Sequence, residues 1–441
     1  MNITPATIKS ALFQVISNAE NNINDFVKNP NKDMTRHRSC CFSDTILSIM
    51  HFTMCKTNTE LLEYFSAASK RVPTQSAFCQ QRKKLNDKLF PHLLKSFNKI
   101  FPASKKYKGY TLMAVDGSDL NLPAYKRDTV YRVKQARSDN CYYQMHLNAL
   151  YNILDNRFHS ISIQPRPKMN ESEAFCQLVN DPDFDNKTIF IADRGYIALN
   201  TLAHLIDNGK SFLIRAISPA SSGSLLRNIV EPNIESDKMI TLGITRSRKK
   251  RNHNSQIIMK HIEKKRHFEP IPNGDYESIY YMTIRVVCIK LDNGEYEYLV
   301  TNLPADEFPP SELRVLYHLR WKIENSFRSL KYATALVYLH SVNREFIIQE
   351  IYAKIILYNF ASILHSYAEK EHCKCKKNDT KYDYKVSFDN VFPVARKLLT
   401  KRMSNKTTKT LLLMHKTPKR KDASHPRRMR SQSAKPLNSR A

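Results

Sequence analysis

Three acidic residues are spaced so that they could share metal ions. Asp116 follows the apolar run 110–115, Asp193 follows the apolar run 188–192, and Glu324 lies in a long segment with helical periodicity. A charge at the end of a buried strand is costly unless something pairs with it, and three clustered carboxylates repel one another. Divalent cations that prefer oxygen ligands, Mg²⁺ first among them, relieve this repulsion. Two such ions about 3.5–4 Å apart can activate a water and stabilise the leaving oxygen of a phosphodiester.

The segment around Glu324 predicts a helix over residues 311–332 with three distinct faces. A serine at its start can cap it after two prolines, and no Gly or Pro interrupts it. With Glu324 set at zero, Tyr317 falls at about +20°, Arg320 at about −40° and Lys331 at about −20°, beside an apolar stripe. Ion pairs between Glu324 and neighbouring arginines on a solvated face would explain the same residues. The two aspartates elsewhere in the chain favour a functional face instead.

The composition indicates which class of molecule the protein binds. Its 441 residues include 70 Lys plus Arg against 41 Asp plus Glu, a formal net charge of +29. Such an excess indicates a polyanionic partner, nucleic acid first and an anionic membrane surface second. No apolar run approaches the roughly 18 residues of a membrane-spanning helix, and the N-terminus lacks the features of a signal peptide. We therefore expect two to four domains and no membrane partner.

The cysteines and histidines do not predict a metal site. Nine scattered cysteines indicate reduced thiols in a cytoplasm. The segment His-Cys-Lys-Cys at 372–375 resembles half of a zinc site, but no second close pair of ligands accompanies it. The 15 histidines show no spacing typical of metal ligands, and none is predicted to be functional.

Residues 1–103 are predicted to form a helical domain. Apolar positions recur at helical spacing in three segments, at 8–26, 42–52 and 89–100. Between them, a short helix after Pro73 carries Arg82, Lys83 and Lys84. A turn followed by a helix with clustered cations is compatible with DNA binding, and a solvated basic face explains it equally well.

Residues 104–216 change from helical to strand patterning. The expected order is three strands, a helix, a strand, a helix and a strand. This is the succession of a ribonuclease H-like core, an α/β fold in which helices pack on a mixed sheet. The strands are expected at 110–115, 142–153, 158–163, 188–192 and 211–216, and the helices at 171–179 and 199–207.

Residues 217–305 interrupt this core. Alternating apolar segments and Asn-Gly turns at 273–274 and 293–294 predict an antiparallel β insertion. The insertion carries basic stretches at 246–251 and 260–266. These stretches either track DNA or form solvated loop faces.

Residues 306–372 are predicted to return to the core. They contain the helix of Glu324 and a further helix at 345–367. Residues 373–441 form a basic C-terminal region. From His415 onward this region is rich in Lys, Arg, Ser and Pro, which predicts a disordered tail.

The motif on the long helix resembles that of a known family. The spacing Tyr317-x2-Arg320-x3-Glu324-x6-Lys331 is similar to the Y-R-E-K signature of the IS4 family of DDE transposases, bacterial insertion-sequence enzymes. The β insertion before the glutamate is also typical of that family. The resemblance spans about residues 73–365.

By this resemblance, Asp116, Asp193 and Glu324 would be catalytic and would hold two Mg²⁺ ions, for which Mn²⁺ can substitute. Asp116 in Asp-Gly-Ser and Asp193 in Asp-Arg-Gly-Tyr match the first two acidic motifs of the family. Its enzymes cut double-stranded DNA at the terminal inverted repeats of their element and join the freed 3′-hydroxyls to target DNA. A homodimer on paired ends is expected. The alternatives are a decayed or domesticated copy that only binds DNA, and a nuclease of the same fold.

The resemblance also implies that Tyr317, Arg320 and Lys331 bind DNA phosphates. A hydroxyl donor, a bidentate fork and a point charge suit that task. A relative in the family forms a hairpin at the transposon end and stacks a flipped base on a tryptophan of its β insertion. In this chain the one tryptophan, Trp321, lies in the signature helix. The tyrosines that could replace it in the insertion are Tyr276, Tyr280, Tyr281, Tyr296 and Tyr298.

Three further acidic residues lie near the first motif or open a helix. Asp119, three residues after Asp116, is expected to cap a turn rather than to bind metal. Glu171 and Glu173 are expected in the first turn of a helix, where acidic side chains favour the helix dipole.

Overall fold

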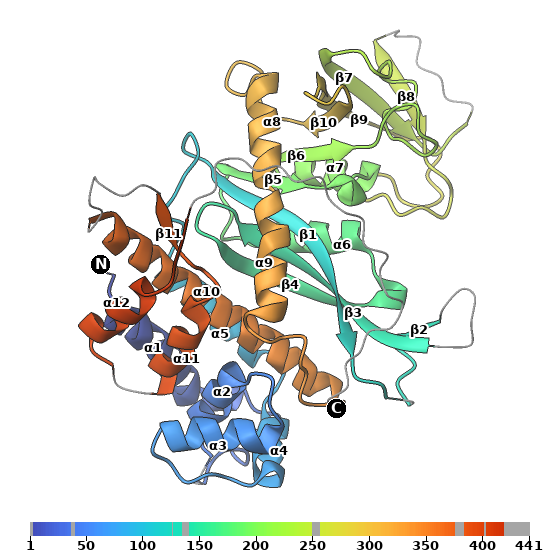
Figure 1. The fold of residues 1–441 in the computed structure, drawn as a ribbon. Coiled ribbons are helices and arrows are strands. Elements are labelled where there is room, and N and C mark those ends of the chain that lie inside the picture. The colour runs from blue at the N-terminus through green and yellow to red at the C-terminus, as the bar shows by residue number, and fades with distance from the viewer. Residues whose placement is uncertain are drawn as a thin grey trace.

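The computed structural model describes residues 3–36, 40–125, 127–134, 141–248, 256–374, 383–400 and 403–418. Within these residues, ten strands form one mixed sheet, and helices cover both of its faces (Figure 1). The protein is therefore an α/β protein, as the sequence predicts.

The ribonuclease H-like part of the sheet has the predicted succession of strands and helices, apart from the short strand β2, which was not predicted. Strand β1 lies between β3, to which it is antiparallel, and β5, to which it is parallel; β5 is in turn parallel to β6. Strand β4 forms the predicted hairpin with β3. The bounds are Thr111–Leu122 for β1, Arg132–Lys134 for β2, Cys141–Asn152 for β3, Arg157–Pro165 for β4, Thr188–Ala192 for β5 and Ser211–Ala216 for β6.

Strand β1 is longer than predicted. The sequence analysis ended it before Asp116, because Asp116-Gly117-Ser118-Asp119 reads as a turn. In the structure the strand continues to Leu122, because each of these residues has a partner on β3, as Asp116 has in Ala149. Only the parallel pairing with β5 stops at Val115.

The insertion extends the core sheet. Strand β10 pairs antiparallel with β6, and β9, β7 and β8 follow outward. The prediction of a purely antiparallel insertion is wrong, because β8 runs parallel to β7. A turn at 293–294 joins β9 to β10, with Gly294 at φ +83°. The bounds are Ser236–Thr245 for β7, Ile257–His261 for β8, Ile279–Lys290 for β9 and Tyr296–Thr301 for β10.

Each face of the sheet has its own buried cluster. Alternate residues of β1 point to opposite faces, so Leu112 and Ala114 pack with α9 and α10, whereas Met113 and Val115 pack with α6 and α7. Figure 1 shows α8 and α9 end to end across the sheet. The bounds are Glu171–Val179 for α6, Leu199–Asp207 for α7, Pro310–Leu319 for α8, Trp321–Tyr332 for α9 and Arg344–Lys374 for α10.

The long signature helix is divided in two. The chain enters α8 at Pro310, one residue before the expected cap, and a proline there fits the first helical position. Helix α8 ends before Arg320 and α9 begins after it. The backbone N–H of Arg320 donates to the carbonyl of Tyr317 at 3.0 Å, a three-residue spacing tighter than that of an α-helix. One continuous helix was therefore the wrong prediction.

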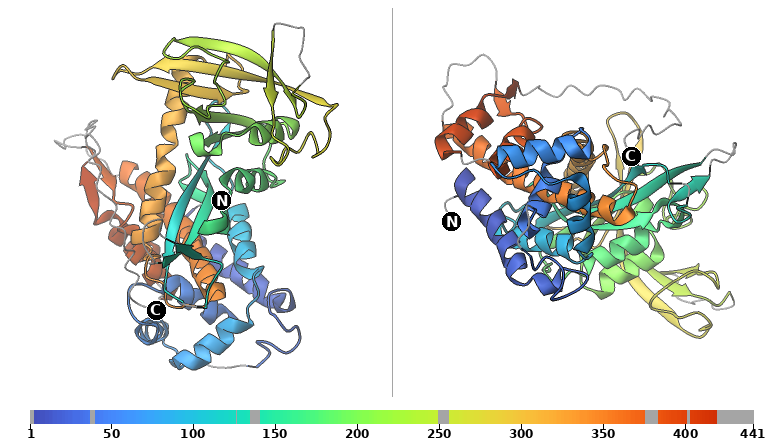
Figure 2. Two further views of the ribbon diagram at one scale, coloured as in Figure 1. Left: turned by 90° about the vertical axis from the view of Figure 1, so that its right-hand side faces the viewer. Right: turned by 90° about the horizontal axis from the view of Figure 1, so that it is seen from below.

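The N-terminal helices pack on the C-terminal ones. Helices α2 and α5 contact α10, and α1 contacts both α5 and α10. Two views of Figure 2 show them gathered at one end of the molecule, away from the insertion. The bounds are Pro5–Asn21 for α1, Phe42–His51 for α2, Thr57–Ala67 for α3, Gln75–Lys84 for α4, Leu89–Ile100 for α5, Val391–Thr400 for α11 and Asn405–Leu413 for α12.

Arg82 on α4 is buried. Both interpretations of the cations on this helix, DNA contact or solvated face, required exposure, and for Arg82 both are wrong. Its guanidinium pairs with Glu350 of α10 at 3.1 Å and donates to the side chain of Gln349 at 2.8 Å. Only its neighbour Lys83 is exposed. Arg82 therefore joins the N-terminal helices to α10.

Helix α10 is the main core helix of the described residues. By length and composition it is also long and apolar enough to cross a membrane, which the sequence analysis overlooked. In the structure, 89% of that apolar window is buried. Core helices of soluble proteins meet the same criteria, so the window is weak evidence for a membrane segment.

The prediction of a disordered tail from His415 onward is wrong for the first residues of that segment. Residues Lys416–Pro418 form β12, which pairs antiparallel with β11, Tyr384–Val386. The rest of the predicted tail, residues 419–441, lies outside the described part of the chain.

Candidate active site

Two parallel strands bring the aspartates together. The pairing of β1 with β5 ends at Val115 opposite Ala192, and the next residue on each strand is Asp116 and Asp193 respectively. Asp116 therefore lies within β1, still paired with β3, beside Asp193, which directly follows the end of β5.

Arg320 joins the glutamate to the first aspartate. Its Nη1 lies 3.3 Å from Oδ2 of Asp116, and its Nη2 lies 2.9 Å from Oε1 of Glu324, one turn further along α9. The Tyr317 hydroxyl donates to Oδ1 of Asp193 at 2.9 Å. The structure thus links Glu324 to Asp116 through Arg320, and it places the hydroxyl of Tyr317, from the same signature, against Asp193.

Arg320 is less exposed than the two carboxylates that it contacts. The Arg320 side chain is 3% exposed, whereas those of Asp116 and Glu324 are 21% and 29% exposed. Burial raises the pKa of Asp116 to about 6, although Arg320 lowers it. Burial also acts to raise the pKa of Asp193, but hydrogen bonds from the Arg194 backbone and Tyr317, with the charge of Arg320, lower it overall.

Lys331 contacts β1 three residues after Asp116. Its Nζ donates to the backbone carbonyl of Asp119 at 2.5 Å, and burial lowers its pKa. The Arg320 guanidinium carbon lies 5.3 Å from the centre of the ring of Trp321, which is 38% exposed. Arg320 and Lys331 therefore contact the protein itself here, and their predicted phosphate contacts stay a prediction.

The acidic residues have the donor chemistry for a divalent metal, although their oxygens do not all lie within 4.8 Å of one another. Asp116, Asp193 and Glu324 offer hard carboxylate oxygens, the donors that Mg²⁺ and Mn²⁺ prefer. A single buried cation, Arg320, is shared between two of the carboxylates. Arg320 thus contacts two of the three carboxylates, and the third, Asp193, accepts a hydrogen bond from Tyr317.

Asp119 does not cap a turn. Its Oδ1 lies 2.6 Å from Nδ1 of His146 on β3, and its Oδ2 lies 3.0 Å from Nε of Arg166. Nε2 of His146 lies 3.2 Å from Oε1 of Glu171, which opens α6 as predicted. His146 was not predicted, because its only signal in the sequence is a histidine within a strand that also contains other polar residues.

The tyrosines of the insertion differ in exposure. Tyr298 is buried and accepts a hydrogen bond from the Asn233 backbone N–H, and the Tyr280 hydroxyl donates to Asp207. Tyr281 is 49% exposed and Tyr276 is 36% exposed. The half-buried Tyr296 and these two exposed residues are left as possible base-stacking positions.

The basic stretches of the insertion are partly structural. Arg246 is buried, and its guanidinium donates to the backbone carbonyls of Glu263, Arg266 and Ile271. Residues 249–255 lie outside the described part of the chain. Of the two stretches, the segment 260–266 is thus the better described candidate for a DNA contact.

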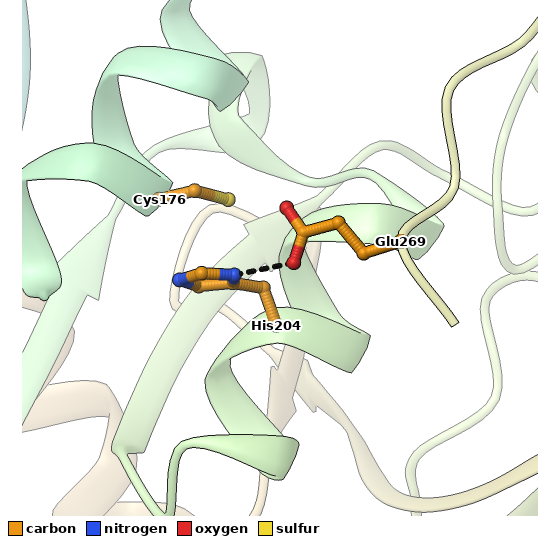
Figure 3. Close-up of side chains that lie close together, drawn as sticks. All are labelled: Cys176, His204 and Glu269. Atoms are coloured by element: carbon orange, nitrogen blue, oxygen red, sulfur yellow. Dashed lines mark hydrogen bonds and ion pairs between the residues drawn. The ribbon is translucent and has the colours of Figure 1, made fainter.

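Cys176, His204 and Glu269 form the one His/Cys/Asp/Glu cluster with metal-ligand proximity in the described residues (Figure 3). Both ring nitrogens of His204 have partners: Nδ1 lies 2.7 Å from Glu269 and Nε2 lies 2.8 Å from Asn180. Burial raises the pKa of the Cys176 thiol to about 11. Hydrogen bonds therefore account for this cluster, which fastens the insertion to α6 and α7.

The histidine of the His-Cys-Lys-Cys segment at 372–375 also makes a hydrogen bond rather than lying near a second set of metal ligands. Nε2 of His372 lies 3.0 Å from the carbonyl oxygen of Tyr384, and Cys373 is exposed. Cys375 lies outside the described residues.

The fold and the site together define the class of protein: a ribonuclease H-like α/β protein with acidic residues on two neighbouring parallel strands and on a helix that packs against the sheet. Residues 107–360 match the family model described as the transposase DDE domain. This match covers more than half of the chain, and the chain belongs to that transposase family. Enzymes with this domain generally use divalent metal ions.

A solved structure is similar at low identity. It is the cryo-EM structure of the piggyBac transposase synaptic complex with hairpin DNA, 11% identical, with a TM-score of 0.46 over 90% of this chain and 80% of that one. None of the curated proteins compared with the chain matches it.

Proposed function

We propose that the protein is an IS4-type DDE transposase that cuts double-stranded DNA at the ends of its insertion sequence and joins the 3′-hydroxyls to target DNA. The observation that carries this proposal is the convergence of Asp116, Asp193 and Glu324 around Arg320 within a transposase DDE domain. Ordinary surface ion pairs would not require two neighbouring strands and a helix to meet.

The chain's own residues have distinct tasks in this proposal. Asp116, Asp193 and Glu324 hold Mg²⁺, and Mn²⁺ can replace it. When bound, two such ions activate the attacking hydroxyl or water and stabilise the leaving oxygen of the phosphodiester. Tyr317 orients the Asp193 carboxylate through its hydroxyl group, and the buried Arg320 keeps Asp116 and Glu324 close together.

The DNA partner is proposed from charge. A net charge of +29 favours a long polyanion over a small substrate. Tyr317, Arg320 and Lys331 are proposed to meet DNA phosphates once metal and DNA rearrange their present contacts. A homodimer acting on paired inverted repeats in a bacterial cytoplasm completes the proposal, because two ends must be cut and joined together.

The first experiment incubates the purified chain with the genomic DNA that flanks its gene and Mg²⁺, and maps cleavage at nucleotide resolution. We expect cuts at inverted repeats, and loss of at least about 1,000-fold in rate for Asp116→Asn, Asp193→Asn and Glu324→Gln. Glu173→Gln, on an exposed turn of α6, is the matched control and should cleave like wild type.

The same reactions separate the alternatives. Products joined to target DNA exclude a simple nuclease. Binding without any cut, in Mg²⁺ and in Mn²⁺, would contradict an active transposase and favour a copy that only binds DNA. Near wild-type cleavage by one of the three acidic variants would remove that residue from the site.

A further inference from the structure

The glycines of both aspartate motifs face the same side chain. A Cβ added at Gly117, directly after Asp116, would lie 2.4 Å from Nε2 of His146 and 2.9 Å from Oε1 of Glu171. A Cβ added at Gly195 would lie 2.9 Å from Oε2 of Glu171. Neither glycine has a positive φ, so close approach rather than backbone conformation explains them. The two carboxylate oxygens of Glu171 thus face different motifs: one faces the glycine after Asp116, and the other faces the glycine after Asp193.

Glu171 lies on the face of the sheet opposite to the metal-binding carboxylates. Along β1, Leu112 and Ala114 face α9, and Asp116 continues that series toward Arg320. Met113 and Val115 face α6, and Gly117 continues that series. Glu171 therefore faces the backbone directly after Asp116 and shortly after Asp193, from the side of the sheet opposite to Arg320.

His146 fixes Glu171 in this place. The imidazole lies between Asp119 of β1, 2.6 Å from Nδ1, and Glu171 of α6, 3.2 Å from Nε2, and its side chain is 6% exposed. The contact with Glu171 is short but poorly aligned as a hydrogen bond. A buried ring with a carboxylate at each nitrogen has little freedom to move, so β1, β3 and the start of α6 are held together.

We propose that Glu171, held by His146, is a positioning residue of the active site. It sets the spacing of the Gly117 and Gly195 backbones, and with it the spacing of Asp116 and Asp193. This inference rests on the proposed function, because that spacing matters for a divalent metal held by both aspartates. Residues that orient metal ligands without touching the metal typically change affinity by about 10–100-fold when they are replaced.

The test measures Mn²⁺ affinity directly, by titration of the full chain with Mn²⁺ followed by electron paramagnetic resonance. Glu171→Ala is expected to weaken Mn²⁺ binding by about 10–100-fold. Glu171→Gln keeps the shape and is expected to recover part of that loss. Glu173→Ala is the control, because Glu173 shares the first turn of α6 but bonds only Asn170 and Gln177.

A double substitution tests the contact itself. Gly195→Ala alone should weaken Mn²⁺ binding, because its new methyl group meets Glu171. With Glu171→Ala already present, Gly195→Ala should add nothing further, since the opposing carboxylate is gone. Additive losses, or equal affinities for Glu171→Ala, Glu173→Ala and wild type, would overturn the proposal.

Two further outcomes separate this inference from the proposed function. If wild type binds Mn²⁺, loses it in Asp116→Asn and yet cuts no DNA, the proposed function fails while the affinities still decide the role of Glu171. If wild type binds no Mn²⁺, the positioning role is overturned. If Glu171→Ala does not fold, the Mn²⁺ affinities of Glu171→Gln and Gly195→Ala test the positioning role instead.

Discussion

Arg320 is the residue on which the metal-free site depends. Its guanidinium is the buried cation between Asp116 and Glu324, and both carboxylates keep some access to solvent. A divalent ion bound by those carboxylates would also neutralise them, with two positive charges in place of one. Arg320 is therefore expected to stabilise the metal-free chain and to compete, in part, with metal.

Replacing Arg320 with methionine separates these two effects. Arg320→Met should destabilise the metal-free chain by about 1–3 kcal/mol, because the carboxylates lose their partner. Mn²⁺ should then raise the thermal unfolding temperature more in the variant than in wild type. Thermal unfolding with and without Mn²⁺ checks both, with the exposed Arg328→Met as control. A smaller metal effect in Arg320→Met than in wild type would contradict this role.

A second prediction concerns the protonation of His146. Burial alone would lower its pKa, but contacts with Asp119 and Glu171 raise it to about 9. The unfolded value is about 6.5, so the folded chain binds the proton more tightly. The resulting stability is fully present below about pH 6.5 and is lost as pH rises through about 9.

Urea unfolding at pH 6 and pH 9.5 measures this effect. Wild type should lose more free energy of unfolding between these values than His146→Gln, which carries no titrating ring. Equal losses would show that His146 is not held as a cation between the two carboxylates.

Helices α4 and α10 are joined by one of the least exposed ion pairs among the described residues. The side chains of Arg82 and Glu350 are each 2% exposed, and His340 binds the second oxygen of Glu350. This ion pair spans most of the sequence, so it couples the N-terminal helices to the core helix. Sequence reasoning could not find it, because a cation beside Lys83 and Lys84 reads as surface until its partner is known.

Arg82→Ala should therefore destabilise the protein by about 3–5 kcal/mol, since it leaves the buried charge of Glu350 without its main partner. The neighbouring change Lys83→Ala should stay within about 0.5 kcal/mol. Chemical unfolding of both variants gives the comparison. A small loss for Arg82→Ala, with weakened DNA binding instead, would restore the DNA-contact interpretation.

Periodicity predicted the elements better than it predicted their junctions. The buried strands β5 and β6 and the helices α6 and α7 are continuous apolar or amphipathic segments, which local patterning identifies. The end of β1 was missed because four polar residues there pair across the sheet. The break at Arg320 was missed because no Gly or Pro marks it.

The candidate site shows the same limit. Motif spacing selected Asp116, Asp193 and Glu324, and the strand register brings the first two together. His146 and Glu171 could not be selected, because their role depends on two glycines and on which face of β1 each residue takes. Such relations exist only once the sheet has formed.

At the scale of the whole molecule, charge is concentrated where the described structure ends. Residues 419–441 contain eight Lys or Arg and one Asp. The last described pairing, of β12 with β11, stops at Pro418. Cations in this segment can add to the affinity for DNA without contributing to the site at Asp116, which is built from distant residues.

A chain ending at Pro418 should therefore keep its unfolding temperature and its metal-dependent cleavage at low salt, but bind DNA less tightly. The slope of log affinity against log salt falls by about 0.9 for each phosphate that the protein no longer neutralises, so it should fall by at most about 7. Filter binding from 50 to 200 mM salt, on random and flanking DNA, gives both slopes. A full-length chain with the eight cations changed to Ser is the matched control. If it keeps the wild-type slope while the shortened chain does not, length rather than charge explains the loss.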